Sequence, residues 1–245
     1  MAKKGYICID SRTANKSFRK MTKKTILLGI LLALLTTMAN AQGVEFFIST
    51  LPNKYLPQLE QSQRQVLLNN YRNKKDSSIN NTYGGKSRLL IYDEEKEYIR
   101  INLSKQGNLA AKKFTMSDGE SLFALCTWTC SPACDGDLSF FKGSNLTPTI
   151  SKNFIPNLYL KDFFILDSLT ANNINADKLE ESFDILFIRY EVQQQSDTIL
   201  AIIGNETYIG EKSFEKWKRR MKGDRIPLVW ENDEFKIGEA FFEKK

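Results

Sequence analysis

The chain has 245 residues, of which 35 are Lys or Arg and 29 are Asp or Glu, and it contains no histidine. Because Ser-His-Asp and Cys-His catalysis both use imidazole as the base, the composition excludes these enzyme classes, together with zinc sites that contain histidine. Residues 42–245 hold 27 basic and 28 acidic residues, since the surplus of positive charge lies in residues 1–41. Without a basic surplus to neutralise phosphates, we expect no nucleic-acid partner.

Residues 22–41 have the pattern of a secretory leader. Lys23 and Lys24 form a basic start, and residues 26–35 form an apolar run of ten. The alternative is a transmembrane helix, but this run is far shorter than the ~20 residues that a bilayer requires. We therefore predict a signal peptide over about residues 21–41 and no transmembrane span in the mature chain. Residues 1–20 are either a long basic extension of this signal or an untranslated stretch.

The end of the predicted signal carries a cleavage pattern. Ala39 and Ala41 place small side chains at the two positions that a signal peptidase recognises, which predicts cleavage before Gln42. Because position 42 is not a cysteine, the pattern does not indicate a lipid anchor. We expect an exported protein, located in the periplasm or secreted.

Residues 42–143 are predicted to contain a helix followed by antiparallel strands. The segment GVEFFIST at 43–50 looks like a short strand. Ser62 is a suitable cap for a helix that runs to about Lys74 and has Val66, Leu67, Asn70 and Tyr71 on one side. Beyond residue 86 the hydrophobic period changes to two. Short turns separate five strand candidates, which predicts an antiparallel meander: SRLLIY, EYIRINL, NLAAKKF, ESLFALCTWTC and CDGDLSFFKG.

The second half is predicted to be mixed. Residues 144–158 contain two prolines and read as a connection. Residues 159–245 form an α+β region that is either separate or continuous with 42–143. Its strands are DILFIRYEVQ, DTILAIIG and a hairpin of RIPLVW and EFKIG around Asn232 and Asp233, and GEKSFEKWKRRMKG is a short helix. YLKDFFILDSL fits helix or strand, and NADKLEESF fits one or two helical turns. The predicted fold class is α+β, with antiparallel β-meander sheets and a few helices packed on one face.

Two short motifs resemble ligand sites but lack required residues. The phosphate loop suggested by YGGKS needs a glycine at position 80, which is Asn80, and the motif leads into a strand instead of a helix. CDGD at 134–137 begins like a calcium loop, but Leu138 and Phe140 follow where further ligands are needed. No spacing singles out a pair of carboxylates for acid–base chemistry. We therefore predict no catalytic residue, no cofactor and no metal site.

The segment CTWTCSPAC places Cys126, Cys130 and Cys134 within nine residues. If this segment forms a strand, a rise of ~3.3 Å per residue separates Cys126 from Cys130 by roughly 13 Å, too far for one metal ion or one disulfide. A hairpin that turns around Pro132 sets Cys130 opposite Cys134, where only a modest adjustment allows a disulfide. We predict this disulfide, which an exported compartment permits, and a free thiol at Cys126.

Two alternatives to this disulfide stay open. The cysteines could be free thiols, or Cys130 and Cys134 could be a redox pair with Cys126 as the resolving thiol. A pair in a hairpin lacks the helix N-terminus that lowers the pKa of a nucleophilic thiol, which makes redox catalysis the weaker alternative.

Several segments resemble an uncharacterised family of exported proteins from gut and oral anaerobic bacteria. The resemblance covers about residues 45–240 and lies in LPNKYLPQLEQSQRQVLLNNY, GGKSRLLIYDEEKEYIRINLS, TWTCSPACDGDLSFF, DILFIRYEVQQQSDTILAIIG and PLVWENDEFKIG. It implies one conserved unit and export. The family is known only as a domain of unknown function, so the resemblance implies no activity and no site residues.

The function that these observations favour is a non-catalytic binding or interaction module. The predicted partner is a protein, a peptide or an envelope component, contacted by sheet edges and aromatic surface. The alternative is a secreted enzyme, either a carboxylate-based hydrolase or a thiol oxidoreductase. A deep polar cleft with two facing carboxylates would favour the enzyme, and a shallow apolar surface would favour binding.

Overall fold

The computed structural model describes residues 42–165, 179 and 181–243, and Gln42–Lys245 form one compact unit. The leader predicted over residues 1–41 lies outside the described residues. The helices are α2 (Val44–Thr50), α3 (Gln61–Arg72), α4 (Leu160–Phe163), α7 (Glu206–Ile209) and α8 (Glu211–Lys218), with short 3-10 turns at Asn53–Tyr55 and Ser151–Asn153. No helix in the described ranges combines the length and the apolar character needed to cross a bilayer.

A seven-stranded antiparallel sheet forms the centre of this unit. Its strands follow sequence order and are β1 (Ser78–Asn80), β2 (Lys86–Asp93), β3 (Tyr98–Asn102), β4 (Gly107–Thr115), β5 (Ser121–Cys130), β6 (Cys134–Lys142) and β7 (Thr147–Thr149). The five predicted strands of the meander are confirmed as β2–β6. The sheet also gains β1, where no strand was expected, and β7 from the predicted connection. Both are three-residue edge strands, and Pro148 lies in β7, at the edge, where a missing N–H is tolerated.

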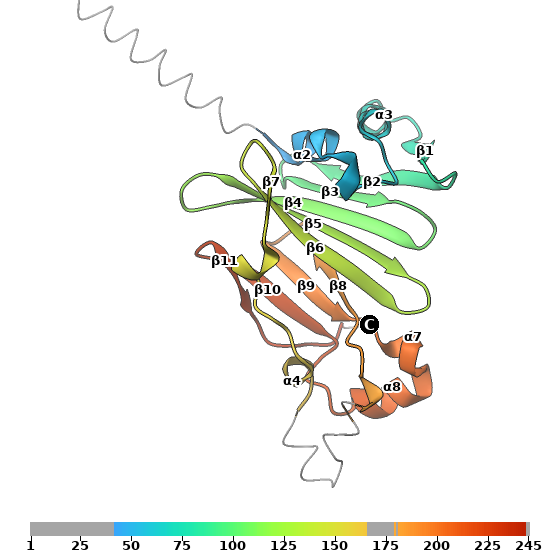
Figure 1. Ribbon diagram of the computed structural model, residues 1–245, viewed down its shortest axis with the longest axis vertical. Coiled ribbons are helices and arrows are strands. Elements are labelled where there is room, and N and C mark those ends of the chain that lie inside the picture. Colours follow the sequence, from blue (N-terminus) through green and yellow to red (C-terminus); the bar gives the residue numbers. More distant parts are fainter. Residues whose placement is uncertain (1–41, 166–178, 180, 244–245) are drawn as a thin grey trace, which may run out of the picture. The chain divides into compact units, whose positions relative to one another are not determined.

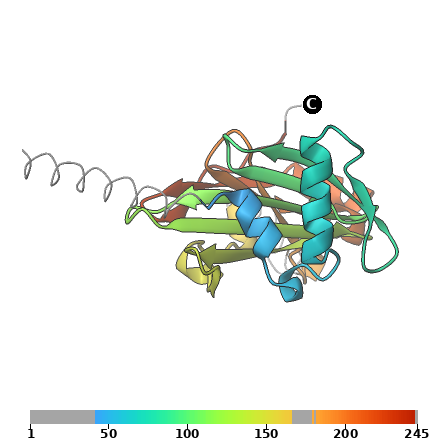
Figure 2. The same cartoon turned by 90° about the horizontal axis from the view of Figure 1, so that it is seen from above.

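Two helices cover one face of this sheet, as Figure 1 and Figure 2 show for α2 and α3. The expectation of a strand at 43–50 is wrong, because these residues form α2. Val44, Phe47, Ile48 and Leu51 recur at helical spacing and are all buried. The Phe47 ring stacks on Phe123 of β5, with centroids 4.8 Å apart. This packing overrides the preference of aromatic and β-branched residues for strands.

Helix α3 is confirmed, but its predicted cap is wrong, and only Leu67 of the side predicted from Val66, Leu67, Asn70 and Tyr71 is fully buried. Glu60, not Ser62, caps the helix, in a capping box with Gln63. The buried residues are Arg64, Leu67 and Leu68, whereas Val66 is 46% exposed. Arg64 is fully buried, and its guanidinium donates hydrogen bonds to the carbonyl oxygens of Ile48 and Leu51, both at 2.7 Å. A buried arginine therefore joins the end of α2 to α3.

A second, four-stranded antiparallel sheet packs against the other face of the first (Figure 1). Its order is β11 (Glu234–Ile237), β10 (Arg225–Glu231), β9 (Thr198–Ile203) and β8 (Ile188–Val192). The predicted two-residue hairpin is confirmed, since Asn232 and Asp233 have φ of 51° and 65°, as a primed turn requires. One or two helical turns were expected at 175–183. Residues 179, 181 and 182 are helical and Phe183 lies in a turn, whereas residues 175–178 and 180 lie outside the described residues.

The core between the sheets is aromatic and aliphatic. Phe114, Leu122, Cys126 and Phe140 of the first sheet meet residues of the second such as Ile199, Ala201, Leu228 and Phe235. One polar side chain crosses the same layer. Lys112 of β4 is 5% exposed, and its ammonium donates to the carbonyl oxygen of Ser196 at 2.7 Å in the β8–β9 turn. Strand β8 lies against β4, β5 and β6, which brings it next to the cysteine hairpin.

Candidate functional site at the cysteine hairpin

The β5–β6 hairpin has the register that the sequence predicts. Cys130 lies opposite Cys134, Trp128 opposite Gly136, and Cys126 opposite Leu138. The sulfur atoms of Cys130 and Cys134 form a disulfide of 2.06 Å. It closes the three-residue turn 131–133, and residues 130–134 are called the hairpin tip below.

The hairpin tip is docked against the second sheet. The hydroxyl of Thr207 in α7 donates a hydrogen bond to the carbonyl oxygen of Pro132 at 2.5 Å. Gly204, at the end of β9, lies so close to the tip that an added Cβ would sit 1.9 Å from the carbonyl oxygen of Cys134. No side chain fits at residue 204 without a backbone shift, because the nearest atom to the added Cβ is itself a backbone atom of Cys134. The disulfide therefore shapes a turn that joins the two sheets.

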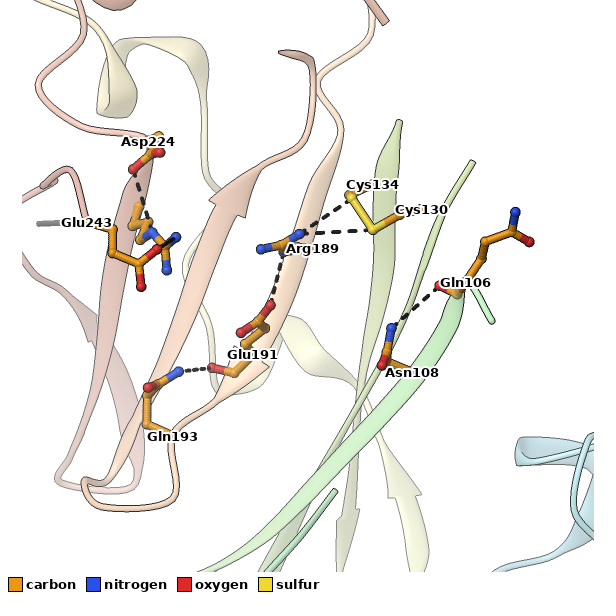
Figure 3. A network of polar contacts seen from close by, with 10 residues as sticks. Gln106, Asn108, Cys130, Cys134, Arg189, Glu191, Gln193, Asp224 and Glu243 are labelled. Carbon is orange, nitrogen blue, oxygen red and sulfur yellow. Dashed lines mark hydrogen bonds and ion pairs between the residues drawn. A yellow bond between two sulfur atoms is a disulfide. The ribbon is translucent and has the colours of Figure 1, made fainter. Parts of the chain in front are cut away.

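A guanidinium lies directly beside the disulfide. Nη1 of Arg189, in β8, is 3.4 Å from Cys134 Sγ and 4.0 Å from Cys130 Sγ. On its other side, Nε of Arg189 is 3.1 Å from Oε1 of Glu191 (Figure 3). The two side chains are 24% and 20% exposed, so their charges are partly shielded from water. Sequence reasoning missed Arg189, although it is the one basic residue in the apolar strand segment 184–193.

The third cysteine is separated from this site. Cys126 is free and fully buried in the core between the sheets. Burial raises the pKa of its thiol to about 12, because the thiolate would lose its hydration. Cys126 therefore stays protonated at neutral pH and acts as a small apolar side chain.

A groove of about 680 Å³ opens beside the hairpin tip. We call it the tip groove. Its lining combines aromatic rings, uncharged polar groups, small residues and two carboxylates: Gln58, Leu103, Ser104, Gly107, Asn108, Thr127, Trp128, Thr129, Ser131, Pro132, Ala133, Asp135, Gly136, Asp137, Phe187 and Tyr208. No lysine or arginine is among these lining residues. The only formal charges in the lining are those of Asp135 and Asp137.

A buried amide fixes the aromatic wall of the tip groove. Asn205 is fully buried, accepts a hydrogen bond from the backbone N–H of Phe187 at 2.9 Å and donates one to the carbonyl oxygen of Ile185 at 2.6 Å. The rings of Phe187 and Tyr208 then meet edge to face, with centroids 5.1 Å apart. Tyr208 is 44% exposed, which presents an aromatic surface to a ligand.

Within the described ranges, no group of three or more Cys, Asp or Glu side chains is placed to hold a metal ion. The sequence predicted the cysteine arrangement but not the tip groove. The groove is built mainly from the β5–β6 hairpin over residues 127–137, and it is completed by the segment before α3, the β3–β4 turn with the start of β4, the segment before β8 and α7. These segments are far apart in the sequence, and no local pattern links them.

Comparison with curated proteins gives no match. Among solved structures, a domain of an uncharacterized protein from Porphyromonas gingivalis W83 has the same fold, with a TM-score of 0.67 and 17% sequence identity. The similarity covers 81% of this chain and 99% of the other. The resemblance to an uncharacterised family that includes oral anaerobes is thereby confirmed. The chain belongs to the family described as protein of unknown function (DUF3256), which it matches over residues 36–235.

Proposed function

We propose that this chain is an exported, non-catalytic binding protein, and that its tip groove takes a basic peptide segment of another envelope protein. Export is supported by the leader pattern of residues 22–41. The observation that carries the proposal is the lining of the tip groove, where aromatic rings and two carboxylates meet with no lysine or arginine.

Charge complementarity indicates a cationic ligand. Asp135 and Asp137 are exposed and lie on the same face of β6, roughly 7 Å apart along the strand. In the part of the chain that the structure describes, neither carboxylate forms an ion pair or a hydrogen bond. A ligand ammonium or guanidinium could therefore pair with them without displacing an internal partner, whereas an anionic ligand would be repelled.

The shape and the aromatic wall fit a peptide. A volume of about 680 Å³ falls within the range of pockets that hold small ligands, and it suffices for a few side chains. Tyr208 and Phe187 offer ring faces to the stems of lysine or arginine, which combine apolar contact with cation–π attraction. The side-chain hydroxyl of Thr129 and the side-chain amide of Gln58 are available to a peptide backbone.

Calorimetric titration of the full, processed chain with synthetic peptides tests this proposal. The peptides share one sequence and carry Lys, Gln or Glu at alternate positions. The Lys peptide is expected to bind best. The double variant Asp135→Asn with Asp137→Asn removes two exposed ion pairs with the peptide, each worth ~0.2–1 kcal/mol. The affinity for the Lys peptide should therefore fall by roughly 2- to 30-fold.

The matched control removes two carboxylates from the β2–β3 turn, by Glu94→Gln with Glu95→Gln, and should leave binding unchanged. Equal binding by the Asp variant and the wild type would show that the tip groove is not the site. Binding of uncharged envelope glycans without binding of any peptide would show that the ligand class is wrong. Binding of neither class would contradict the proposed function itself.

A further inference from the structure

We infer that the Cys130–Cys134 bond is an exchangeable disulfide, in which Cys134 is the leaving thiolate and Arg189 is its counter-ion. The site would react with a thiol or dithiol of a small molecule or of a partner protein. This redox role is additional to the binding of a peptide and uses different side chains.

The position of the guanidinium relative to the two sulfurs is asymmetric. Nη1 of Arg189 is 3.4 Å from Cys134 Sγ but 4.0 Å from Cys130 Sγ (Figure 3). A cation at this distance stabilises a thiolate and lowers the pKa of the corresponding thiol. A thiol of lower pKa is the better leaving group in thiol–disulfide exchange. The geometry therefore favours Cys134 over Cys130 as the sulfur that leaves.

The ion pair with Glu191 does not account for this contact. Glu191 faces Nε of Arg189, whereas Nη1 is turned toward the sulfurs. Among the described residues, no oxygen accepts a hydrogen bond from either terminal nitrogen of Arg189. A disulfide sulfur is a weak acceptor, whereas a thiolate is a strong one. Reduction would thus supply a second anionic partner to this half-buried guanidinium, at Nη1, while Nε keeps its ion pair with Glu191.

The exchange is balanced as follows. A thiolate of the reductant attacks Cys130 Sγ, a mixed disulfide forms, and the electron pair of the broken sulfur–sulfur bond passes to Cys134 Sγ, opposite Arg189. The second thiolate of the dithiol then attacks the other sulfur of the same dithiol, which is bonded to Cys130 in the mixed disulfide. This step closes the disulfide of the reductant and releases Cys130, which takes a proton from water. The dithiol is oxidised to a disulfide, and the protein is reduced by two electrons.

Cys126 takes no part in this exchange. It lies four residues before Cys130 on the same strand, roughly 13 Å away, and it is fully buried. Its raised pKa keeps it protonated and unreactive. The resolving thiol must therefore come from the reductant, in contrast to a mechanism in which the third cysteine of the chain resolves the mixed disulfide.

The test measures how fast each cysteine of the folded, dithiothreitol-reduced protein is alkylated as a function of pH, with peptide mapping by mass spectrometry. In the wild type we expect Cys134 to react with a midpoint well below the ~8.5 of an ordinary thiol, and also below the midpoint of Cys130, whose sulfur lies farther from Arg189. Arg189→Gln should slow alkylation of Cys134 at pH 6.5 by about tenfold or more, because an adjacent opposite charge shifts a pKa by ~1–3 units.

Two further variants separate charge from structure. Arg189→Lys retains the positive charge and should largely restore the rate. Arg225→Gln removes an arginine from β10 that pairs with Asp224 and Glu243, away from the sulfurs, and should change nothing at Cys134. Two thiols with ordinary midpoints in the wild type would overturn the inference, even if Arg189→Gln fails to fold. So would a disulfide that excess dithiothreitol cannot open unless the protein is first denatured.

Discussion

The carbonyl oxygen of Cys134 lies against Gly204, so that the start of β6 in the first sheet touches the end of β9 in the second. An added Cβ at residue 204 would sit 1.9 Å from this oxygen. Together with the hydrogen bond from Thr207 to Pro132, this contact fixes the hairpin tip on the second sheet. It explains why a glycine is required at a position where a strand passes into α7.

We expect Gly204→Ala to destabilise the fold by about 1–3 kcal/mol, because the backbone of one sheet must move away from the other. Urea unfolding followed by tryptophan fluorescence measures this loss. Gly85→Ala is the control, since its added Cβ would meet only the Asn81 side chain at 3.3 Å, and it should cost less. A wild-type unfolding midpoint for Gly204→Ala would contradict the tight contact.

The disulfide predicts a specific count of reactive cysteines. Alkylation of the denatured, unreduced mature chain should label Cys126 alone, because Cys130 and Cys134 are bonded. Replacing both bonded cysteines by alanine should lower the free energy of unfolding by about 2 kcal/mol, as expected for a crosslink that closes a five-residue ring. Three labelled cysteines in mass spectra of the unreduced protein would refute the disulfide.

The parts of this fold that depend on local pattern could be predicted from the sequence. The alternation of Ile99 and Ile101 with polar neighbours, and the turn at Pro132, specify strands and a register that need no distant information. The hairpin at Asn232 and Asp233 is specified in the same way, by two residues that tolerate positive φ.

The parts of this fold that depend on contacts between distant segments could not be predicted from the sequence. Arg189 meets Cys134 across 55 residues of chain, and its role follows only from the packing of β8 against the first sheet. Arg64 carries a charge and was not expected among the buried residues of α3, but the unpaired carbonyl groups at the end of α2 make its burial favourable. The strand preference of Phe46 and Phe47 concealed a helix whose apolar face fits the sheet.

Arg64 should be one of the most sensitive positions in the helical layer. Its guanidinium donates to two carbonyl oxygens and to Oδ1 of Asn53, all at 2.7 Å. Arg64→Leu leaves the two buried carbonyl oxygens of Ile48 and Leu51 unpaired, and each unpaired group costs ~1–3 kcal/mol. We expect a total loss of roughly 3 kcal/mol or more in chemical denaturation.

The control for Arg64 is Arg72→Leu at the other end of the same helix. Arg72 pairs with Glu45 in an exposed ion pair, so its removal should cost no more than ~1 kcal/mol. Equal losses for the two variants would mean that Arg64 is not hydrogen-bonded to the end of α2 as described.

The buried thiol of Cys126 predicts how stability changes in alkaline solution. Burial raises the pKa of this thiol in the folded state from 9.0 to about 12. Above pH 9 the unfolded chain therefore releases a proton that the folded chain retains, and the free energy of unfolding falls as pH rises toward 12. The stabilising contribution is fully present below pH 9 and is lost through this window.

Cys126→Ala removes the titrating group and with it this part of the pH dependence. The variant is less stable than the wild type at pH 7, because a small cavity replaces the sulfur in the core. The difference between the two proteins should shrink steadily between pH 9 and 11 in anaerobic urea unfolding with the disulfide intact. A constant difference across this range would show that Cys126 titrates alike in the folded and unfolded states, and hence that the sulfur is reached by water in the folded protein.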